Sequence, residues 1–324
     1  MEKSDASKLD DELFIHEVIE YAEKYAAEDD EAYIRALNEA YRGAADTGMR
    51  NTSPLRVLPA DAPDMSFQIY KDPRYLQNAR ELARRALGGI RVIGGKPARD
   101  GEFLDCVAVG SDAQWACSGT LIGPNVVLTA GHCAAFATRV FFGNDVTKSG
   151  KVVAVRQRIP HPKYRQGKHN DLMVLLLQER VTTVQPRKMA SKSLIDGATD
   201  GRVVGFGNVD PRGLFGYGLK RMVDVPIVSP NCRGTVEGHD DSLSYGCDRG
   251  LEIVAGRPLL ERDSCKGDSG GPFYVLDGTG QWQIAGATSR ATDSAMHTCG
   301  DGGIYVRVDR YRAWIASIPG AELS

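Results

Sequence analysis

Asp263-Ser264-Cys265-Lys266-Gly267-Asp268-Ser269-Gly270-Gly271-Pro272 is the stretch around which the rest of the 324-residue chain can be interpreted. Its glycines and proline favour tight turns, in which the backbone can expose the hydroxyl group of Ser269. A serine hydroxyl is a weak nucleophile at neutral pH, so it needs a neighbouring base and hydrogen-bond donors for the oxyanion that develops. A chain that uses Ser269 in catalysis must supply both from elsewhere in its sequence.

Two other segments supply such groups. His132 follows the apolar run 126–128, and Asp171 precedes the apolar segment 172–177. Apolar neighbours suit a carboxylate that is buried and orients an imidazole. Taken separately, His132 would more often be a histidine of the core and Asp171 a cap at the end of a strand. Together with Ser269 they form a candidate catalytic triad.

The order of these three residues and their wide spacing resemble the trypsin-like serine proteases, which have the chymotrypsin fold. The resemblance extends from Val92 to about Pro319. It implies an all-β catalytic unit of two antiparallel β-barrels, over about 92–195 and 196–306, with the triad in the cleft between them.

The pattern of residues agrees with a β-rich unit. Short runs of β-branched residues alternate with Gly, Pro and Asn turns after Val92. A hairpin is expected over 115–128, with its turn at Gly123-Pro124-Asn125. The resemblance implies a C-terminal helix over 309–318, which is expected to be the only helix after Val92.

The resemblance implies two-step acyl transfer by a serine endopeptidase. His132 would take the proton of Ser269, whose oxygen would attack a peptide carbonyl, while the N–H groups of Gly267 and Ser269 would hold the oxyanion. Water would then hydrolyse the acyl-enzyme. Neither a cofactor nor a metal is expected, because segment 141–153, where calcium-binding relatives carry several carboxylates, has only Asp145.

Four residues occupy the positions of the family's pocket for the substrate residue that precedes the cleaved bond, although Ala291 stands where Gly is usual and adds a methyl group at the entrance. Asp263 corresponds to the floor, where a carboxylate selects Arg or Lys, and Ser289, Ala291 and Gly303 correspond to the walls. The expected partners are therefore protein substrates with Arg or Lys at this position.

The pocket wall departs from the family pattern beside Ser289. Arg290 stands where the family usually has Trp, and Lys266 stands where a neutral polar residue is common. Two expectations remain open. In the first, both cations overhang the cleft and favour substrates with acidic residues next to the Arg or Lys that precedes the cleaved bond. In the second, both side chains face solvent and select nothing.

A zymogen is implied by Ile90-Arg91-Val92-Ile93-Gly94-Gly95, which resembles the activation site of trypsin-like proteases. Cleavage of the Arg91–Val92 bond would free an α-amino group that is cationic near pH 7. This group is expected to pair with Asp268 and to order the oxyanion hole. The alternative is an ordinary apolar strand that begins after a Gly-rich turn.

Six of the seven cysteines fall where the family places disulfides. The expected pairs are Cys117–Cys133, Cys232–Cys247 and Cys265–Cys299, whereas Cys106 is expected to be a buried thiol. Disulfides suit an oxidising compartment, but residues 1–5 lack the apolar core of a secretory signal. The expected localisation is cytoplasmic if the sequence is full length, or secreted if a signal has been removed.

The first 91 residues differ in charge from the rest, with 18 acids and 13 bases against 24 and 27 downstream. Residues 1–46 have apolar residues at helical spacing and predict an acidic helical hairpin. Residues 47–91 predict a linker and a helix that ends near the activation site, and residues 92–324 the protease domain. The front segment is interpreted as a pro-segment, with docking of a partner protein by 1–46 as the open alternative.

Several classes of protein are disfavoured. The net charge of -2 and the lack of a Lys/Arg-rich block argue against nucleic-acid binding. No run approaches the ~20 apolar residues of a membrane span. His161 and His169 lack partners at metal-ligand spacing, so structural or solvated roles are expected. The competing interpretation is an inactive relative that serves as a binding module, which the intact triad disfavours.

Overall fold

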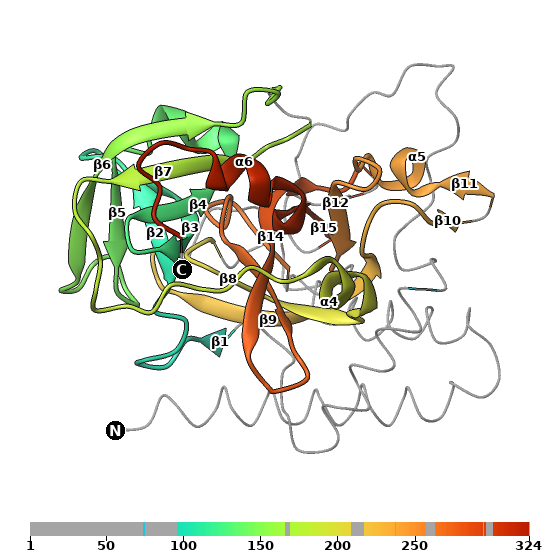
Figure 1. Ribbon diagram of the computed structural model, residues 1–324. Helices are drawn as coiled ribbons and strands as arrows, with labels where there is room; N and C mark the ends of the chain where they lie inside the picture. Colours follow the sequence, from blue (N-terminus) through green and yellow to red (C-terminus); the bar gives the residue numbers. More distant parts are fainter. Residues whose placement is uncertain are drawn as a thin grey trace, which may run out of the picture.

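The computed structural model describes Arg74 and residues 96–165, 169–208, 217–236, 238–256, 263–293, 295 and 301–323. Four predicted features lie outside this part of the chain: the hairpin over 1–46, most of segment 47–91, the bond Arg91–Val92, and Cys299. The described residues form two antiparallel barrels that lie side by side (Figure 1).

The first barrel closes through six strands in the order β2-β3-β4-β7-β6-β5. Its strands are β2 (Cys106–Gly110), β3 (Trp115–Gly123), β4 (Val126–Thr129), β5 (Arg139–Phe142), β6 (Lys151–Pro160) and β7 (Met173–Leu177). β3 pairs with β4 through Leu121 and Val127, which confirms the predicted hairpin. Alternate residues of β7 contribute to two different apolar clusters, since successive side chains of a strand point to opposite faces.

The second barrel has the order β9-β12-β15-β14-β13-β8 and is closed by the pairing of β8 with β9. Its strands are β8 (Asp200–Gly205), β9 (Arg221–Ser229), β12 (Glu252–Ala255), β13 (Pro272–Leu276), β14 (Trp282–Ala291) and β15 (Gly303–Arg307). β1 (Lys96–Pro97) adds to β9, and β10 (Thr235–Val236) forms a separate pair with β11 (His239–Asp240). The predicted fold class is confirmed.

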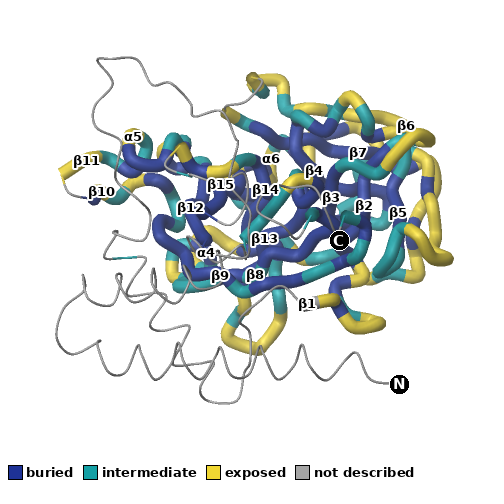
Figure 2. Tube along the Cα trace, turned by 180° about the vertical axis from the view of Figure 1, so that it is seen from behind, coloured by how far each residue is buried: buried dark blue, intermediate teal, exposed yellow. Residues whose placement is uncertain are grey.

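A buried polar cluster joins the two barrels. Asp105 precedes β2 and accepts hydrogen bonds from the Arg187 guanidinium, at 3.0 Å and 2.5 Å, and from the Tyr274 hydroxyl of β13, at 2.6 Å. A buried carboxylate is tolerated when it is paired in this way. Apolar residues of both barrels surround the cluster, and Figure 2 shows buried residues along the strands of both. The barrels are therefore fixed relative to each other.

The C-terminal segment is helical as predicted, with a 3-10 turn η3 (Val308–Tyr311) that continues into α6 (Arg312–Ala316). The expectation that it is the only helix after Val92 is wrong. α4 (Lys192–Gly197) and α5 (Asp241–Tyr245) are two further short helices. α4 begins at a cap in which the Ser191 hydroxyl accepts the N–H of Leu194, and its six residues are too few to show helical periodicity.

The disulfides Cys117–Cys133 and Cys232–Cys247 form as predicted. Cys265 is also disulfide-bonded, with its partner outside the described residues. Cys106 is a buried free thiol, as expected, and its burial raises its pKa above the ordinary value. Within the described residues, no helix has both the length and the apolar character of a membrane-spanning segment.

One described residue of the front segment contacts the second barrel. The Arg74 guanidinium donates to both carboxylate oxygens of Asp241, at 3.0 Å and 2.5 Å. Asp241 is fully buried and also accepts from the Ser229 hydroxyl and from the N–H of Gly234. A cation from before the predicted activation bond is thus paired with a buried anion of the barrel.

Candidate active site

Strand register brings His132 and Asp171 together. His132 lies in the 3-10 turn η2 (Gly131–Ala135) just after β4, and Asp171 lies just before β7. Thr129 at the end of β4 pairs with Met173 at the start of β7. The segment after β4, with His132, therefore meets the segment before β7, with Asp171, at one end of the barrel. His132 Nδ1 is 2.8 Å from Asp171 Oδ2, and the His132 N–H donates to Oδ1 at 2.9 Å.

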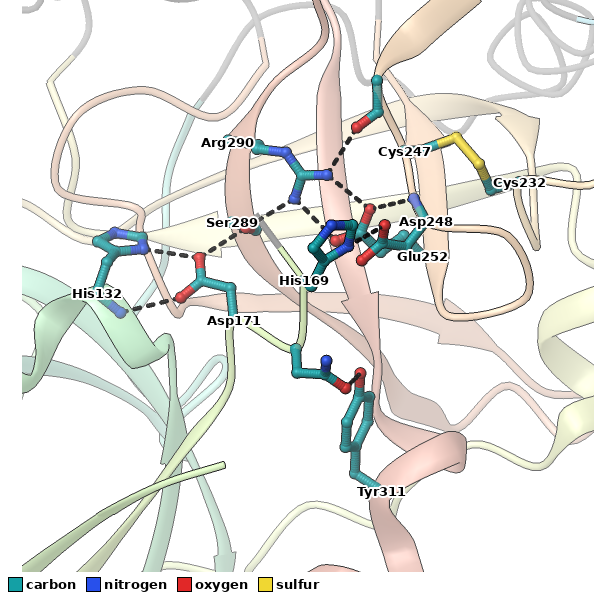
Figure 3. Close-up of polar contacts among 12 residues, drawn as sticks. His132, His169, Asp171, Cys232, Cys247, Asp248, Glu252, Ser289, Arg290 and Tyr311 are labelled. Atoms are coloured by element: carbon teal, nitrogen blue, oxygen red, sulfur yellow. Dashed lines mark hydrogen bonds and ion pairs between the residues drawn. A yellow bond between two sulfur atoms is a disulfide. The ribbon is translucent and has the colours of Figure 1, made fainter. Parts of the chain in front are cut away.

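Asp171 is a buried carboxylate that is held ionised. Burial pushes its pKa upward, but hydrogen bonds from His132 and from the Ser289 hydroxyl outweigh that effect and hold the pKa below its ordinary value. The Ser289 bond is 2.6 Å long and reaches across from β14 of the second barrel (Figure 3). The carboxylate can therefore orient the His132 ring and stabilise its positive charge.

The turn that carries Ser269 packs against the end of β4. Gly267 and Gly270 have φ values of 99° and 76°, which only glycine adopts readily. A Cβ atom on Gly270 would lie 2.0 Å from Thr129 Oγ1, so the close approach itself requires glycine. The N–H of Ser118 donates to the Ser269 carbonyl at 2.9 Å. Ser269 is thereby fixed at the same end of β4 from which His132 extends.

The backbone around Ser269 offers donors and a buried anion. Among the described residues, no acceptor engages the N–H of Gly267 or of Ser269, the two groups predicted to form the oxyanion hole. The Asp268 carboxylate accepts from the N–H groups of Gly207, at 2.8 Å, and Cys265, at 2.9 Å. Burial nevertheless raises the pKa of Asp268 to about 6. These two amides do not neutralise the charge, and a cation would stabilise it.

Asp263 occupies a confined site beside β15. Its Oδ1 accepts the Tyr305 hydroxyl at 2.5 Å, and a Cβ atom on Gly256 would lie 2.5 Å from its Oδ2. Burial raises the pKa of Asp263 to about 7, so the carboxylate is poised to gain from a cationic guest. Ser289 and Ala291 lie two residues apart on β14, and Ala291 pairs with Gly303 of β15. This pairing brings the predicted wall residues together.

Arg290 differs from both expectations, since its guanidinium neither overhangs the cleft as an unpaired cation nor faces solvent alone. It donates to both oxygens of Glu252, each at 2.8 Å, and to the Gly246 carbonyl at 2.8 Å (Figure 3). Its side chain is 20% exposed and that of Glu252 is 1% exposed. A buried ion pair therefore stands where the family usually has an aromatic ring. Lys266 is exposed.

Several residues near the site were not identified from the sequence. The Tyr305 hydroxyl donates to Asp263, and the Glu252 carboxylate accepts from Arg290. Asp248 contacts His169, which lies 79 residues earlier in the chain. None of them belongs to a short motif, and their roles follow from pairings between distant strands and loops. The structural role expected for His169 fits its contact with Asp248.

Potential metal ligands gather at one place among the described residues, away from the His169–Asp248 pair. The single group of three potential ligands among them is Cys117, His132 and Cys133, and its two cysteines are joined to each other in a disulfide. A disulfide sulfur has no thiolate with which to hold a metal. His161 packs against the rings of Tyr311 and Trp314, and burial lowers its pKa.

Two closed six-stranded antiparallel barrels, with a His–Asp pair and a serine turn where they meet, define the class of chymotrypsin-fold serine proteases. Comparison with known proteins agrees. Residues 92–315 match the family described as Trypsin. The chain is similar to Trypsin 5G1 of Aedes aegypti, with 31% identity over 252 residues that cover 75% of this chain and 88% of that protein. The chain belongs to the trypsin family of serine endopeptidases.

Proposed function

We propose that this endopeptidase cleaves protein substrates after Arg or Lys. The observation that carries the proposal is the confined carboxylate of Asp263, whose pKa is raised to about 7 by burial and whose side-chain partner among the described residues is the neutral hydroxyl of Tyr305. A guanidinium or ammonium group that enters the pocket would supply a countercharge through charge-assisted hydrogen bonds. A Cβ atom would lie 2.5 Å from Asp263 Oδ2 on Gly256 and 2.9 Å from the Tyr305 hydroxyl on Gly303, so side chains at these positions would crowd the carboxylate that a long guest must reach.

In the proposed mechanism, His132 is the base and acid, Asp171 orients it, and Ser269 is the nucleophile. His132 takes the proton of Ser269 as the serine oxygen attacks the carbonyl carbon, and the N–H groups of Gly267 and Ser269 stabilise the oxyanion. His132 then protonates the leaving amine. Water, deprotonated by the same histidine, attacks the acyl-enzyme and releases the acid.

Asp263→Ser tests the specificity. The variant should lose about 10²-fold in kcat/KM for peptides with Arg or Lys before the cleaved bond, because the guest cation would be desolvated without a partner. Cleavage after neutral residues should not fall. Asp112→Ser, which removes an exposed carboxylate, is the matched control. A peptide-library profile that is the same for both variants would refute the assignment of Asp263.

The same carboxylate predicts how a small cationic inhibitor binds as pH changes. Asp263 has a raised pKa of about 7, so it is mostly ionised above pH 7 and mostly protonated below it. Affinity for an arylamidine should therefore be full above pH 7 and fall about tenfold per unit below it. Binding is a better readout than turnover, which also needs a neutral His132. The dependence should vanish in Asp263→Ser.

We further propose that the chain is a zymogen that is activated by cleavage of Arg91–Val92. The support is the buried Asp268 carboxylate, whose described partners are two backbone N–H groups and whose pKa is raised to about 6. A new α-amino group that paired with it would neutralise the charge next to Gly267 and Ser269. An oxidising compartment, as for a secreted protein, is proposed because five cysteines are disulfide-bonded.

The contact of Arg74 with Asp241 predicts that the front segment stays bound after activation. Cleavage at Arg91–Val92 leaves Arg74 on the released side, but its departure would take away the cation that pairs with buried Asp241 among the described residues. The cut segment should co-elute with the barrel domain in gel filtration, and Arg74→Gln should weaken this association by about tenfold.

The matched control for this experiment is Asp240→Asn, which changes the neighbouring carboxylate that pairs with exposed Arg249. Equal retention in Arg74→Gln and in the control would show that the ion pair does not hold the segment. Docking of another protein by residues 1–46 remains a separate proposal, which a pull-down with residues 1–70 would test.

A further inference from the structure

The loop that leads into Asp171 has an unusual backbone. His169 and Asn170 are consecutive residues with φ values of 44° and 54°. L-residues other than glycine seldom adopt this left-handed region, and two in succession persist only where surrounding contacts impose them. The conformation sets the direction in which the next residue, Asp171, presents its carboxylate.

Each residue of this turn has one side-chain contact from beyond the first barrel, in addition to contacts within it. The Asn170 side chain accepts the hydroxyl of Tyr311, at 3.0 Å, and donates to the Lys163 carbonyl, at 3.3 Å. His169 Nδ1 lies 2.5 Å from Asp248 Oδ1. Asp248 lies between α5 and β12 of the second barrel, and Tyr311 lies in η3 after its last strand. The turn therefore bridges the two halves of the domain (Figure 3).

Asp248 is itself fixed by the ion pair of Glu252 with Arg290. Its N–H donates to Glu252 Oε2 at 2.7 Å, and Glu252 pairs with Arg290. Arg290 Nη1 is 3.3 Å from the hydroxyl of Ser289, which donates to Asp171. One group of bonded residues thus reaches Asp171 from two sides, through Ser289 and through the His169–Asn170 turn.

The charges near this group favour the contact between His169 and Asp248. Asp171, Glu252 and Asp248 all lie near the Arg290 guanidinium, so three carboxyl groups share the neighbourhood of this cation. The Asp248 side chain is 14% exposed, and its Oδ2 is buried without a hydrogen-bond partner among the described residues. An incompletely satisfied buried carboxylate costs free energy. His169 gives Asp248 a side-chain donor and, when protonated, a countercharge.

We propose that His169 and Asp248 are positioning residues for the triad. Their contact across the two barrels holds the left-handed turn and thereby fixes the Asp171 carboxylate against His132. Neither residue touches the reacting atoms. The family's pattern of catalytic residues does not require this pair, which depends on the contact of the loop before β12 with His169.

The alternative is a surface ion pair without a functional role, since the His169 side chain is 52% exposed. Substitutions of His169 separate the two. His169→Gly permits the same backbone conformation but removes the contact. His169→Asn keeps an amide donor on a residue that tolerates positive φ. Asp248→Ala removes the acceptor.

The experiment compares steady-state kinetics on one small substrate that the wild-type active enzyme cleaves. His169→Gly and Asp248→Ala should each lower kcat about tenfold with KM changed less than twofold, because a misplaced carboxylate impairs the chemical step and not substrate binding. The double variant should lose no more than either single variant. His169→Asn should retain most of the wild-type kcat. The control is Arg249→Ala, which changes the residue after Asp248 and breaks its exposed ion pair with Asp240. This variant should leave kcat unchanged.

A spectroscopic readout does not depend on activity or on the proposed specificity. The proton resonance of His132 Nδ1–H reports its hydrogen bond to Asp171 and should shift or broaden in His169→Gly and Asp248→Ala, but not in Arg249→Ala. Unchanged kcat and an unchanged resonance in both variants would overturn the proposal. A His169→Asn variant as impaired as His169→Gly would also overturn it, as would losses confined to KM or to thermal stability.

Discussion

Ser269→Ala should lower the rate of peptide hydrolysis by about 10⁴-fold or more, while peptide binding stays close to that of the wild type. The reason is that His132 and the oxyanion donors would remain, but no oxygen would be left to attack the carbonyl. Steady-state kinetics, with single-turnover detection of the acyl-enzyme, would measure both parts. The variant should form no acyl-enzyme.

The matched control is Ser149→Ala, which removes the hydroxyl of an exposed serine in the loop between β5 and β6. It should keep full activity. Substantial activity in Ser269→Ala, with the control unchanged, would show that another group is the nucleophile. Full retention of fold, measured by thermal unfolding, is expected in both variants, since the Ser269 carbonyl still accepts the N–H of Ser118.

Arg91→Gln should keep the chain about 10³-fold less active than the cleaved wild type. Without the cut there is no α-amino group to pair with Asp268, and both oxyanion donors next to it would be poorly positioned; loss of a single such donor costs 10²–10³-fold in other enzymes. The cleaved wild type should have Val-Ile-Gly-Gly as its new N-terminus. N-terminal sequencing and activity measured on the same sample provide the test.

Arg99→Gln is the control for this variant, because it removes a nearby exposed arginine and leaves the Arg91–Val92 bond intact. It should be cleaved and become active like the wild type. Because the proposed specificity includes Arg91, the wild type should also activate itself slowly. A fully active Arg91→Gln protein with an uncut chain would refute the activation mechanism, although the enzyme would remain a serine endopeptidase.

The sequence alone was sufficient for the fold class and the candidate triad. The three residues stand in short motifs whose local chemistry is visible without coordinates: an apolar run before His132, an apolar strand after Asp171, and glycines around Ser269. The turn residues 123–125 also predicted the hairpin of β3 and β4, and the resemblance to the protease family predicted the C-terminal helix. Periodicity missed α4 and α5, because five or six residues cannot establish a helical period.

The tertiary structure alone decided which charges meet. Glu252 pairs with Arg290, Asp248 with His169 and Asp241 with Arg74, at separations of 38, 79 and 167 residues. The sequence shows these as isolated charges, so for Arg290 it offered only an overhang of the cleft or a position in solvent. Strand register and barrel closure bring such residues together, and burial then makes an unpaired charge costly. Local motifs specify the chemical groups of this protein, whereas the packing of its two barrels determines their partners.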